Sequence, residues 1–441
     1  MKDIKPNADL LVRNISRLAV VPGPGPRRGA DLAEIGLVPR AALLVGEGRV
    51  LWAGPEQQLP AASVRAEYDA GGRAVVPGFV DPHTHAVFAG DRVEEFERRV
   101  RGATYQEILA GGGGILSTVR ATRAASLETI VAESAARLEA MLAHGTTTVE
   151  IKTGYGLSLE GEIKLLRAIE RLAGEFAGRL TIVPTFLPAH AVPAEHRDDP
   201  DAFVDEIVRE ILPAGMAAHT ETAEGSVSSG AAGKRPGVAS LLFADVFCEA
   251  GVFDVAQTRH ILERARDLGY GLKLHVDEFE ALGGTSLACE LGATSADHLM
   301  ATGPEEIALL AASRTVAVLL PGTTFGLGKH DYARARDFIG AGAAVALATD
   351  LNPGTCWCVS MPFIMALAAR YLRLSAAEAL AAATLNAAHA VGLGHERGSL
   401  SPGYAADFLV LATDDERHLA YRFGQNLVAA VFKEGSLLQQ K

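Results

Sequence analysis

Cysteine is scarce in this sequence, and long uncharged hydrophobic runs are absent. Four cysteines in 441 residues are too few for a disulfide framework, and none forms a Cys-x-x-Cys pair. The pair Cys356 and Cys358 leaves chelation open, but two buried thiols are the interpretation we favour. The longest uncharged stretch, 351–369, contains the run Asn-Pro-Gly-Thr, so it is not a membrane span.

A surplus of basic residues is also missing. Lys and Arg number 41 against 53 Asp and Glu, a net charge of −12, so a nucleic acid is not an expected partner. The first residues, MKDIKPNADLLVRN, lack the charged-then-apolar layout of a secretory signal. With 49% hydrophobic and 21% charged residues, the composition is that of a globular protein. We therefore expect a soluble cytoplasmic protein with no membrane partner.

Short β-like segments occur at both ends of the chain. DLLVRN, AALLVGEG and RVLWAG lie near the start, and DFLVLA and LVAAVFKEG lie near the end. Because chain termini often lie close together, the two ends are able to pair. The sequence predicts a small β-sandwich domain formed by residues 1–77 and 398–441.

Between these ends, apolar strands alternate with long amphipathic helices. Continuous apolar runs suit parallel strands that are buried on both faces. We expect strands at 74–81, 146–152, 180–187, 243–249, 272–278, 293–299, 315–322 and 344–350. Helical patterns such as 126–145 and 158–176 fall between them. This alternation predicts an α/β fold, a (β/α)8 TIM-type barrel over residues 78–397.

One segment breaks this alternation. Residues 214–240 are rich in Gly, Ala and Ser and have no apolar period, which favours a mobile surface insertion with a solvated His219. A second Gly-rich run, 110–120, lacks the Gly-Lys-Ser/Thr ending of a phosphate loop and does not follow a strand. We interpret that second run as a flexible loop near the substrate.

Polar residues collect where the predicted strands end, which is where barrel enzymes place their sites. They are His83 and His85 after the first strand, His275 and Glu278, His298, and Asp350. Each has an ordinary explanation, because a lone His near a strand end is usually a satisfied polar residue and an Asp there often caps a helix. Their gathering at one end of one barrel weakens that explanation.

The His-x-His pair suggests a metal site. Alternation along a strand puts His83 and His85 on the same side. A third imidazole and one carboxylate would complete a nitrogen and oxygen site for zinc or iron with room for water. The pair alone is a moderate signal, and its combination with a later His, His and Asp on successive strands is a strong one.

The sequence resembles the amidohydrolase superfamily, and within it is similar to the imidazolonepropionase family of histidine degradation. Nearly the whole chain matches, through runs such as DPHTHAVFAGDRVEEFERR, GGGGILSTVRATR, TGYGLSLEGEIKLL, LHVDEFEALGG, SADHL and ATDLNPGT. His-x-His would fit any superfamily member, whereas the stretch from Asp91 to Arg123 is far more particular. The 214–240 insertion is longer than that family's pattern leads us to expect.

The resemblance implies roles for individual residues. It implies metal ligation by His83, His85, His275 and Asp350. It places the substrate near Arg92, Tyr155, His190, Glu278, Asn352, Gly354 and Thr355. His298 takes a polarising or water-orienting role, and Asp350 and Glu278 are candidates for proton transfer. The histidines that match no site motif are expected to be structural: His144, His260, His389 and His395.

The same resemblance implies a reaction and a cofactor. The expected reaction is hydrolysis of the cyclic amide of 4-imidazolone-5-propanoate to N-formimidoyl-L-glutamate by a metal-activated water. Some superfamily members hold two metals bridged by a modified lysine on the fourth strand, but here that strand ends Phe247-Cys248-Glu249. Lys152 ends the second strand, the wrong place for a bridge. We expect one divalent ion per subunit, Zn²⁺ or Fe²⁺/Fe³⁺, in a homodimer.

Two other readings stay open from the sequence. The same residues would serve a deaminase or another cyclic amidase, and a barrel that has lost catalysis would persist as a scaffold. The complete ligand set argues against the scaffold.

Overall fold

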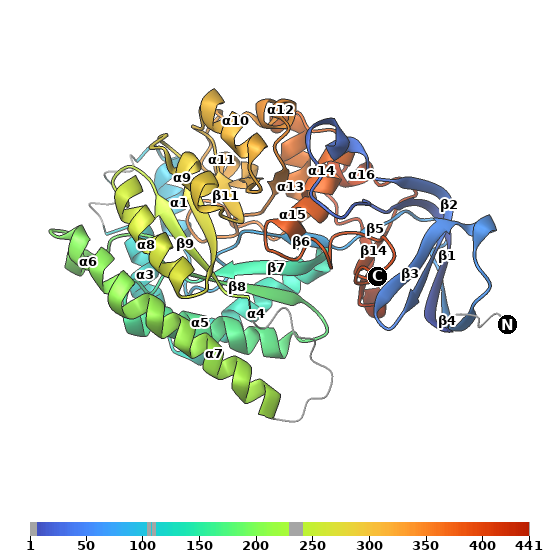
Figure 1. Ribbon diagram of the computed structural model, residues 1–441, viewed down its shortest axis with the longest axis horizontal. Coiled ribbons are helices and arrows are strands. Elements are labelled where there is room, and N and C mark those ends of the chain that lie inside the picture. The colour runs from blue at the N-terminus through green and yellow to red at the C-terminus, as the bar shows by residue number, and fades with distance from the viewer. Residues whose placement is uncertain (1–6, 104–106, 108–111, 229–240, 441) are drawn as a thin grey trace.

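The computed structural model describes residues 7–103, 107, 112–228 and 241–440. Its largest element is a sheet of eight parallel strands in chain order, surrounded by helices on the left of Figure 1. The strands are β6 (Phe79–Asp81), β7 (Thr146–Lys152), β8 (Thr181–Ala189), β9 (Phe243–Cys248), β10 (Gly271–Val276), β11 (Ser295–His298), β12 (Val316–Leu319) and β13 (Val345–Leu347). This confirms the predicted barrel.

The ring of strands is completed just beyond the ends of β6 and β13. Thr84 and Leu351 form a parallel bridge there. The barrel strands are buried along almost their whole length, as their continuous apolar sequences require. The carboxyl ends of the first and last strands are therefore joined to each other directly.

Helices pack around the outside of the barrel. The two helices expected from periodicity are α4 (Leu127–Ala143) and α5 (Leu159–Glu175), and they begin after Ser126 and Ser158. Each serine side chain accepts a hydrogen bond from a backbone amide of the first turn, which satisfies one of the free donors of a helix start.

Of the remaining helices, α7 (Leu212–Ser228) is as long as α4 and α5, at 17 residues, and the others are shorter. They are α1 (Val93–Val100), α3 (Ile115–Ala124), α6 (Pro200–Glu206), α8 (Val255–Asp267), α9 (Gly284–Leu291), α10 (Pro304–Ala312), α11 (Pro321–Gly326), α12 (Ala335–Ala341), α13 (Met361–Leu367), α14 (Ala376–Ala382), α15 (Leu385–His389) and α16 (His418–Tyr421). Short 3-10 turns span Gly29–Ala33, Glu56–Gln58 and Ala194–His196, and π-helical turns span Ile207–Ile211 and Ala368–Leu372.

The two ends of the chain share a second sheet, on the right of Figure 1. Its strands are β1 (Asn7–Ala19), β2 (Leu37–Gly46), β3 (Arg49–Pro55), β4 (Ser63–Asp69), β5 (Val75–Pro77), β14 (Phe408–Leu411), β15 (Val428–Lys433) and β16 (Ser436–Gln440). Tyr68 of β4 meets Phe432 of β15 with ring centroids 5.0 Å apart, although β1, β5 and β14 separate these strands in the sheet. The sheet therefore folds over its own apolar core.

Buried charges join the small sheet to the barrel. Lys433 of β15 donates to Asp407 Oδ2 at 2.8 Å and to Thr147 O of barrel strand β7 at 2.8 Å. Arg397 also donates to Asp407 Oδ2, at 2.6 Å. A buried carboxylate paired with two cations is compatible with this dry junction because each charge has a partner.

The prediction of a loop over residues 214–240 is wrong for the first part of that segment. Residues up to Ser228 continue helix α7, and residues 229–240 lie outside the described residues. Ala, Met and Glu favour a helix here, although Gly and Ser over the full window hide that preference. His219 is buried rather than solvated, and its Nδ1 lies 3.1 Å from Glu170 Oε1.

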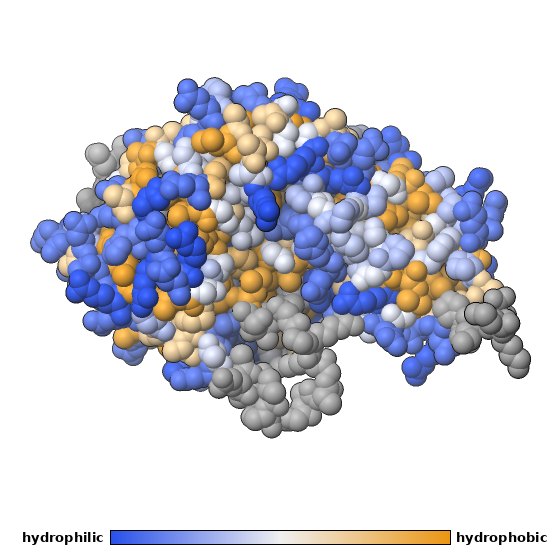
Figure 2. All heavy atoms as spheres, in the orientation of Figure 1, coloured by the Kyte–Doolittle hydropathy of each residue, from blue (hydrophilic) through white to orange (hydrophobic). Residues whose placement is uncertain are grey.

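Hydrophilic side chains cover much of the face shown in Figure 2, and hydrophobic areas between them are small. Within the described ranges, no helix is both long enough and apolar enough to cross a membrane. The expected buried thiols are partly confirmed, since Cys356 is buried and Cys358 is half-buried.

Candidate metal centre

His83 and His85 follow β6 and are fixed to the last strand of the barrel. The His85 amide donates to Leu351 O at 2.8 Å, and the Asp350 amide donates to His83 O at 3.1 Å. Because alternate residues of an extended chain point the same way, both imidazoles project toward one side. Backbone hydrogen bonds thus bring two histidines and an aspartate together from opposite ends of the barrel sequence.

Four side-chain atoms converge at this place. Asp350 Oδ1 lies 3.5 Å from His83 Nε2 and 3.7 Å from His85 Nε2. His275 Nε2, from β10, lies 3.4 Å from His85 Nε2. Two atoms bound at about 2.1 Å to one tetrahedral ion lie about 3.4 Å apart. Ligand atoms of His83, His85 and Asp350 lie within 4.8 Å of one another, and His275 adjoins this group through His85, so these spacings are those of ligands around one ion.

The chemistry of the donor set also fits a cation. All four side chains are buried, and among the described residues His83 Nε2 has no hydrogen-bond partner. Burial, and then the charges of Lys152 and the neighbouring imidazoles, lowers the pKa of His83 well below its usual value. A neutral imidazole keeps a lone pair for a metal. Buried lone pairs aimed at one another repel unless a cation lies between them.

Two buried aspartates orient the imidazoles from behind. His83 Nδ1 forms a hydrogen bond with Asp297 Oδ2 at 2.7 Å, and His275 Nδ1 lies 3.0 Å from Asp245 Oδ2 in an ion-pair contact without hydrogen-bond geometry. A carboxylate that accepts the Nδ1 proton leaves the Nε2 lone pair facing the opposite way, as for His83. His275 Nε2 also faces the centre, since it lies 3.4 Å from His85 Nε2.

Asp350 is held in a restricted conformation. Its φ is +51°, in the left-handed region that is uncommon for residues other than Gly. Its Oδ2 accepts a hydrogen bond from Thr323 Oγ1, and its backbone carbonyl accepts one from Asn352 Nδ2 at 2.8 Å. These bonds fix one carboxylate oxygen and leave Oδ1 toward the histidines. Burial raises the pKa of Asp350 to about 6 in the absence of a metal.

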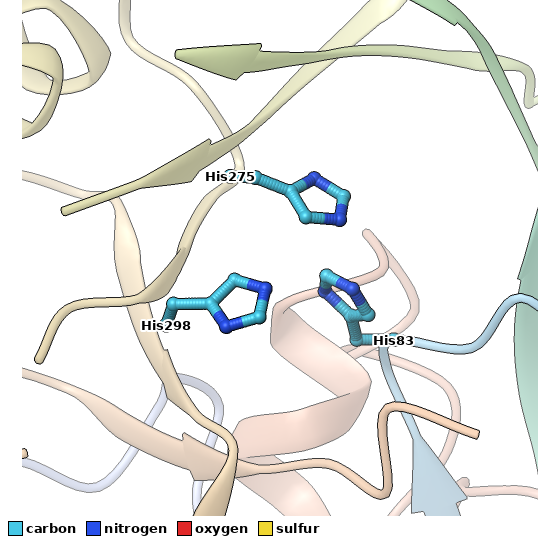
Figure 3. Close-up of side chains that lie close together, drawn as sticks. All are labelled: His83, His275 and His298. Carbon is cyan, nitrogen blue, oxygen red and sulfur yellow. The ribbon is translucent and has the colours of Figure 1, made fainter. Parts of the chain in front are cut away.

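His298 and Glu278 lie beside the four convergent side chains. Figure 3 shows the imidazoles of His83, His275 and His298 facing one another from three different segments. Ligand atoms of these three histidines lie within 4.8 Å of one another, so His298 is a possible fifth ligand by distance. His298 Nδ1 is 3.7 Å from Glu278 Oε2. Burial, and then the charge of Asp350, raises the pKa of Glu278 to about 8.

Tyr155 and His190 line the side of the centre next to His85. The His190 ring stacks on His85 with centroids 4.7 Å apart, and Tyr155 packs 5.2 Å from His190. His190 Nδ1 lies 2.9 Å from Gly154 O, so an Nδ1–H would donate there. A Cβ at Gly154, whose φ is +104°, would lie 2.8 Å from His190 Nδ1. Only glycine fits this approach.

Arg92, Gly354 and Thr355 border a cleft of about 440 Å³ at the start of α1. Glu95 accepts from Arg92 Nε at 2.9 Å and also from Nη2. A Cβ at Gly354 would collide with Arg92 Nη1, so the guanidinium lies directly on that backbone. Asn352 Oδ1 accepts from the amides of Gly354 and Thr355, both at 2.8 Å. The Asn352 side chain therefore shapes this loop.

The convergent side chains are predicted from the sequence, whereas the residues that hold them from behind are not assigned that role. Asp245 and Asp297 fall inside strands that are predicted to be buried, and Lys152 ends another; a charge in such a strand is the signal that would have found them. Glu162 is also missed. Its carboxylate accepts from the amides of Gly154, Gly156 and Leu157 at 2.7–3.0 Å and fixes the loop that carries Tyr155.

Comparison with known proteins identifies close relatives. The model of the amidohydrolase family matches residues 74–438. The chain is 52% identical to an imidazolonepropionase of Herpetosiphon aurantiacus, over 99% of this chain and 98% of that protein. It is 43% identical to an imidazolonepropionase of Bacillus velezensis, over 97% of this chain and 96% of that protein.

Solved structures show the same fold at lower identity. A zinc-bound adenosine deaminase from Xanthomonas campestris is 17% identical with a TM-score of 0.70, and the match covers 98% of this chain and 93% of that one. A triazine hydrolase variant is 18% identical with a TM-score of 0.71, over 98% and 94% of the two chains. At these identities the likeness concerns the fold alone.

The geometry predicts that His275 is needed for metal binding. His275→Ala should lose stoichiometric metal, measured by elemental analysis after dialysis, and should keep its circular dichroism spectrum because the barrel does not depend on this imidazole. His389→Ala, on helix α15, is the matched control and should keep its metal. A His275→Ala protein that retains one equivalent would remove this residue from the ligand set.

Proposed function

Because this chain belongs to the imidazolonepropionases of the amidohydrolase family, we propose that it hydrolyses 4-imidazolone-5-propanoate to N-formimidoyl-L-glutamate in histidine degradation. Two facts together carry this proposal. The chain matches an imidazolonepropionase over 99% of its length, and the imidazoles of His83, His85 and His275 lie close together beside the carboxylate of Asp350. The substrate is a small cyclic amide with an anionic tail, so it needs an activated water, a proton donor and a partner for its carboxylate.

One divalent ion, Zn²⁺ or iron, would be held by His83, His85, His275 and Asp350. Such an ion supplies Lewis acidity and makes a water molecule acidic enough to attack near neutral pH. A single ion is proposed because β9 carries no lysine and Lys152 is engaged by carboxylates: its Nζ lies 2.7 Å from Glu150 Oε1 and 2.8 Å from Asp245 Oδ2. Neither strand therefore offers a lysine whose Nζ is free to be modified and to bridge two metals.

Asp350 and Glu278 are the proposed proton carriers. Asp350 would accept the proton of the attacking water, since its Oδ1 faces the histidines. Glu278 is buried, and its raised pKa lets it hold a proton near neutral pH and deliver it to the leaving ring nitrogen. The pKa of His298 is lowered by burial, so the imidazole is neutral and would donate an N–H to the developing carbonyl oxyanion.

Arg92 is the proposed partner of the substrate's propionate group. A planar guanidinium binds a carboxylate through two parallel hydrogen bonds, which gives orientation as well as attraction. Glu95 holds Nε and Nη2, and Nη1 lies over Gly354 beside Thr355. Tyr155 and His190 would then contact the ring from the side of His85. The cytoplasmic location and the homodimer stay predictions.

A substrate panel tests the reaction. The purified protein should turn over imidazolone propionate and should leave aminated heterocycles unchanged, because its relatives at 43–52% identity are imidazolonepropionases. Turnover of aminated rings only would favour a deaminase, which the fold of several solved relatives also serves. A preparation with less than half an equivalent of metal and no turnover, purified without chelators, would favour a scaffold.

The role of Arg92 predicts a binding defect. Arg92→Ala should raise KM and weaken substrate binding by about 2–5 kcal/mol, the range for losing one partner of a desolvated charge pair. Arg101→Ala serves as a control, because Arg101 is exposed and pairs with Glu97 at 3.3 Å. Steady-state kinetics on both variants measures the difference. An unchanged KM for Arg92→Ala would contradict the role.

A further inference from the structure

A layer of buried charges lies behind the convergent histidines, and Lys152 is at its centre. This residue ends β7 and is fully buried. Its Nζ lies 2.7 Å from Glu150 Oε1, 2.8 Å from Asp245 Oδ2 and 3.9 Å from Asp297 Oδ2. One ammonium therefore faces carboxylates from three different barrel strands.

The two aspartates around Lys152 are the same ones that contact the imidazoles. Asp245 Oδ2 faces both Lys152 Nζ and His275 Nδ1, and Asp245 Oδ1 accepts from the His275 amide at 3.2 Å. Asp297 Oδ2 lies 2.7 Å from His83 Nδ1. Each carboxylate oxygen is thus shared between a lysine on one side and an imidazole on the other.

Glu150 extends this link to the backbone between the two histidines of His-x-His. Its Oε1 accepts from Lys152 Nζ, and its Oε2 accepts from the Thr84 amide at 3.2 Å. Thr84 Oγ1 also donates to Glu150 O at 2.7 Å. Lys152 is therefore connected, through one carboxylate in each case, to His83, His275 and the chain that carries His85.

Lys152 is charged in this setting. Burial alone would lower its pKa, but Asp245, Glu150 and Asp297 outweigh burial and raise it above the usual value. A second buried lysine, Lys273, also lies 3.9 Å from Asp297 Oδ2, but its Nζ donates to Ser295 Oγ at 2.7 Å and to Ala390 O at 2.9 Å and does not approach Asp245 as Lys152 does. Removing Lys152 would leave buried carboxylates without their cation, and these would rotate or take up water to find new partners.

We propose that Lys152 is a positioning residue of the metal centre, which holds the carboxylates of Asp245 and Glu150 so that His275 and the His-x-His segment present their ligand atoms to the ion. The inference rests on the proposed function for its metal site, but not for its substrate. Lys152 is not one of the proposed ligands, and its Nζ faces Glu150 and Asp245 behind them. Residues that orient a ligand from behind typically contribute about 10–100-fold to metal affinity.

The test compares two buried lysines that each pair with a buried aspartate. Lys152→Met removes the ammonium that faces Glu150 and Asp245 behind the histidines. Lys433→Met removes the ammonium that donates to Asp407 Oδ2 and to Thr147 O, both at 2.8 Å. Affinity of the metal-free full chain for Zn²⁺ is measured by competition with a chelator. The visible spectrum of the Co²⁺-loaded protein reports ligand geometry, and denaturant unfolding reports stability.

Lys152→Met should bind Zn²⁺ about 10–100-fold more weakly and show an altered Co²⁺ spectrum. Lys433→Met should lose stability while keeping wild-type affinity and spectrum, because its carboxylate holds no ligand. Lys152→Gln, which keeps one donor group, should fall between wild type and Lys152→Met and replaces it if that variant does not fold. Folded Lys152 variants with affinity within about twofold of wild type and an unchanged spectrum would overturn the inference.

The outcomes also separate this inference from the proposed function. Wild-type protein that binds metal but does not open imidazolone propionate would contradict the function, and a Lys152 defect in metal affinity would still support the positioning role. Wild-type protein that hydrolyses the substrate, with Lys152 variants that bind metal normally, would support the function and reject the positioning role.

Discussion

Two backbone hydrogen bonds, from His85 to Leu351 and from Asp350 to His83, determine what this molecule is able to do. They close the barrel between its first and last strands, and they bring the proposed ligands His83, His85 and Asp350, which are far apart in the sequence, into one place. Closing the sheet and assembling the site are the same event. A protein that closed this ring in another register would turn His83 and His85 away from Asp350, because a shift of one residue reverses every side chain.

Bringing these buried polar side chains together costs free energy in backbone strain and desolvation, and the surrounding residues offset that cost. Asp350 and His298 adopt positive φ angles of +51° and +84°, which non-glycine residues rarely do without support. Support for Asp350 comes from Thr323 and Asn352, and support for His83 and His275 comes from Asp297 and Asp245. Buried carboxylates in turn need cations, and Lys152 supplies one. The centre is therefore built in successive layers, each satisfying the charges of the one inside it.

The sequence predicts the barrel, and it points to histidines and an aspartate that lie together in the structure, for a physical reason. Parallel strands buried on both faces read as continuous apolar runs, and a histidine or aspartate at the end of such a run is conspicuous. Asp245, Asp297 and Lys152 lie within those runs, and their purpose depends on neighbours from other strands that the sequence does not identify. Helix α7 was missed because composition over 214–240 averages a helical segment with the residues after it. The Asn352 side chain shapes the loop of Gly354 and Thr355, and its place at the substrate stays a prediction.

X-ray absorption spectroscopy on the zinc-loaded protein tests the central claim most directly, because it reports the ligands of the ion whatever the activity. The account predicts a shell of nitrogen and oxygen atoms only, at about 2.0–2.2 Å, with the multiple scattering of three imidazoles. A sulfur ligand at about 2.3 Å, or scattering from a single imidazole, would contradict it.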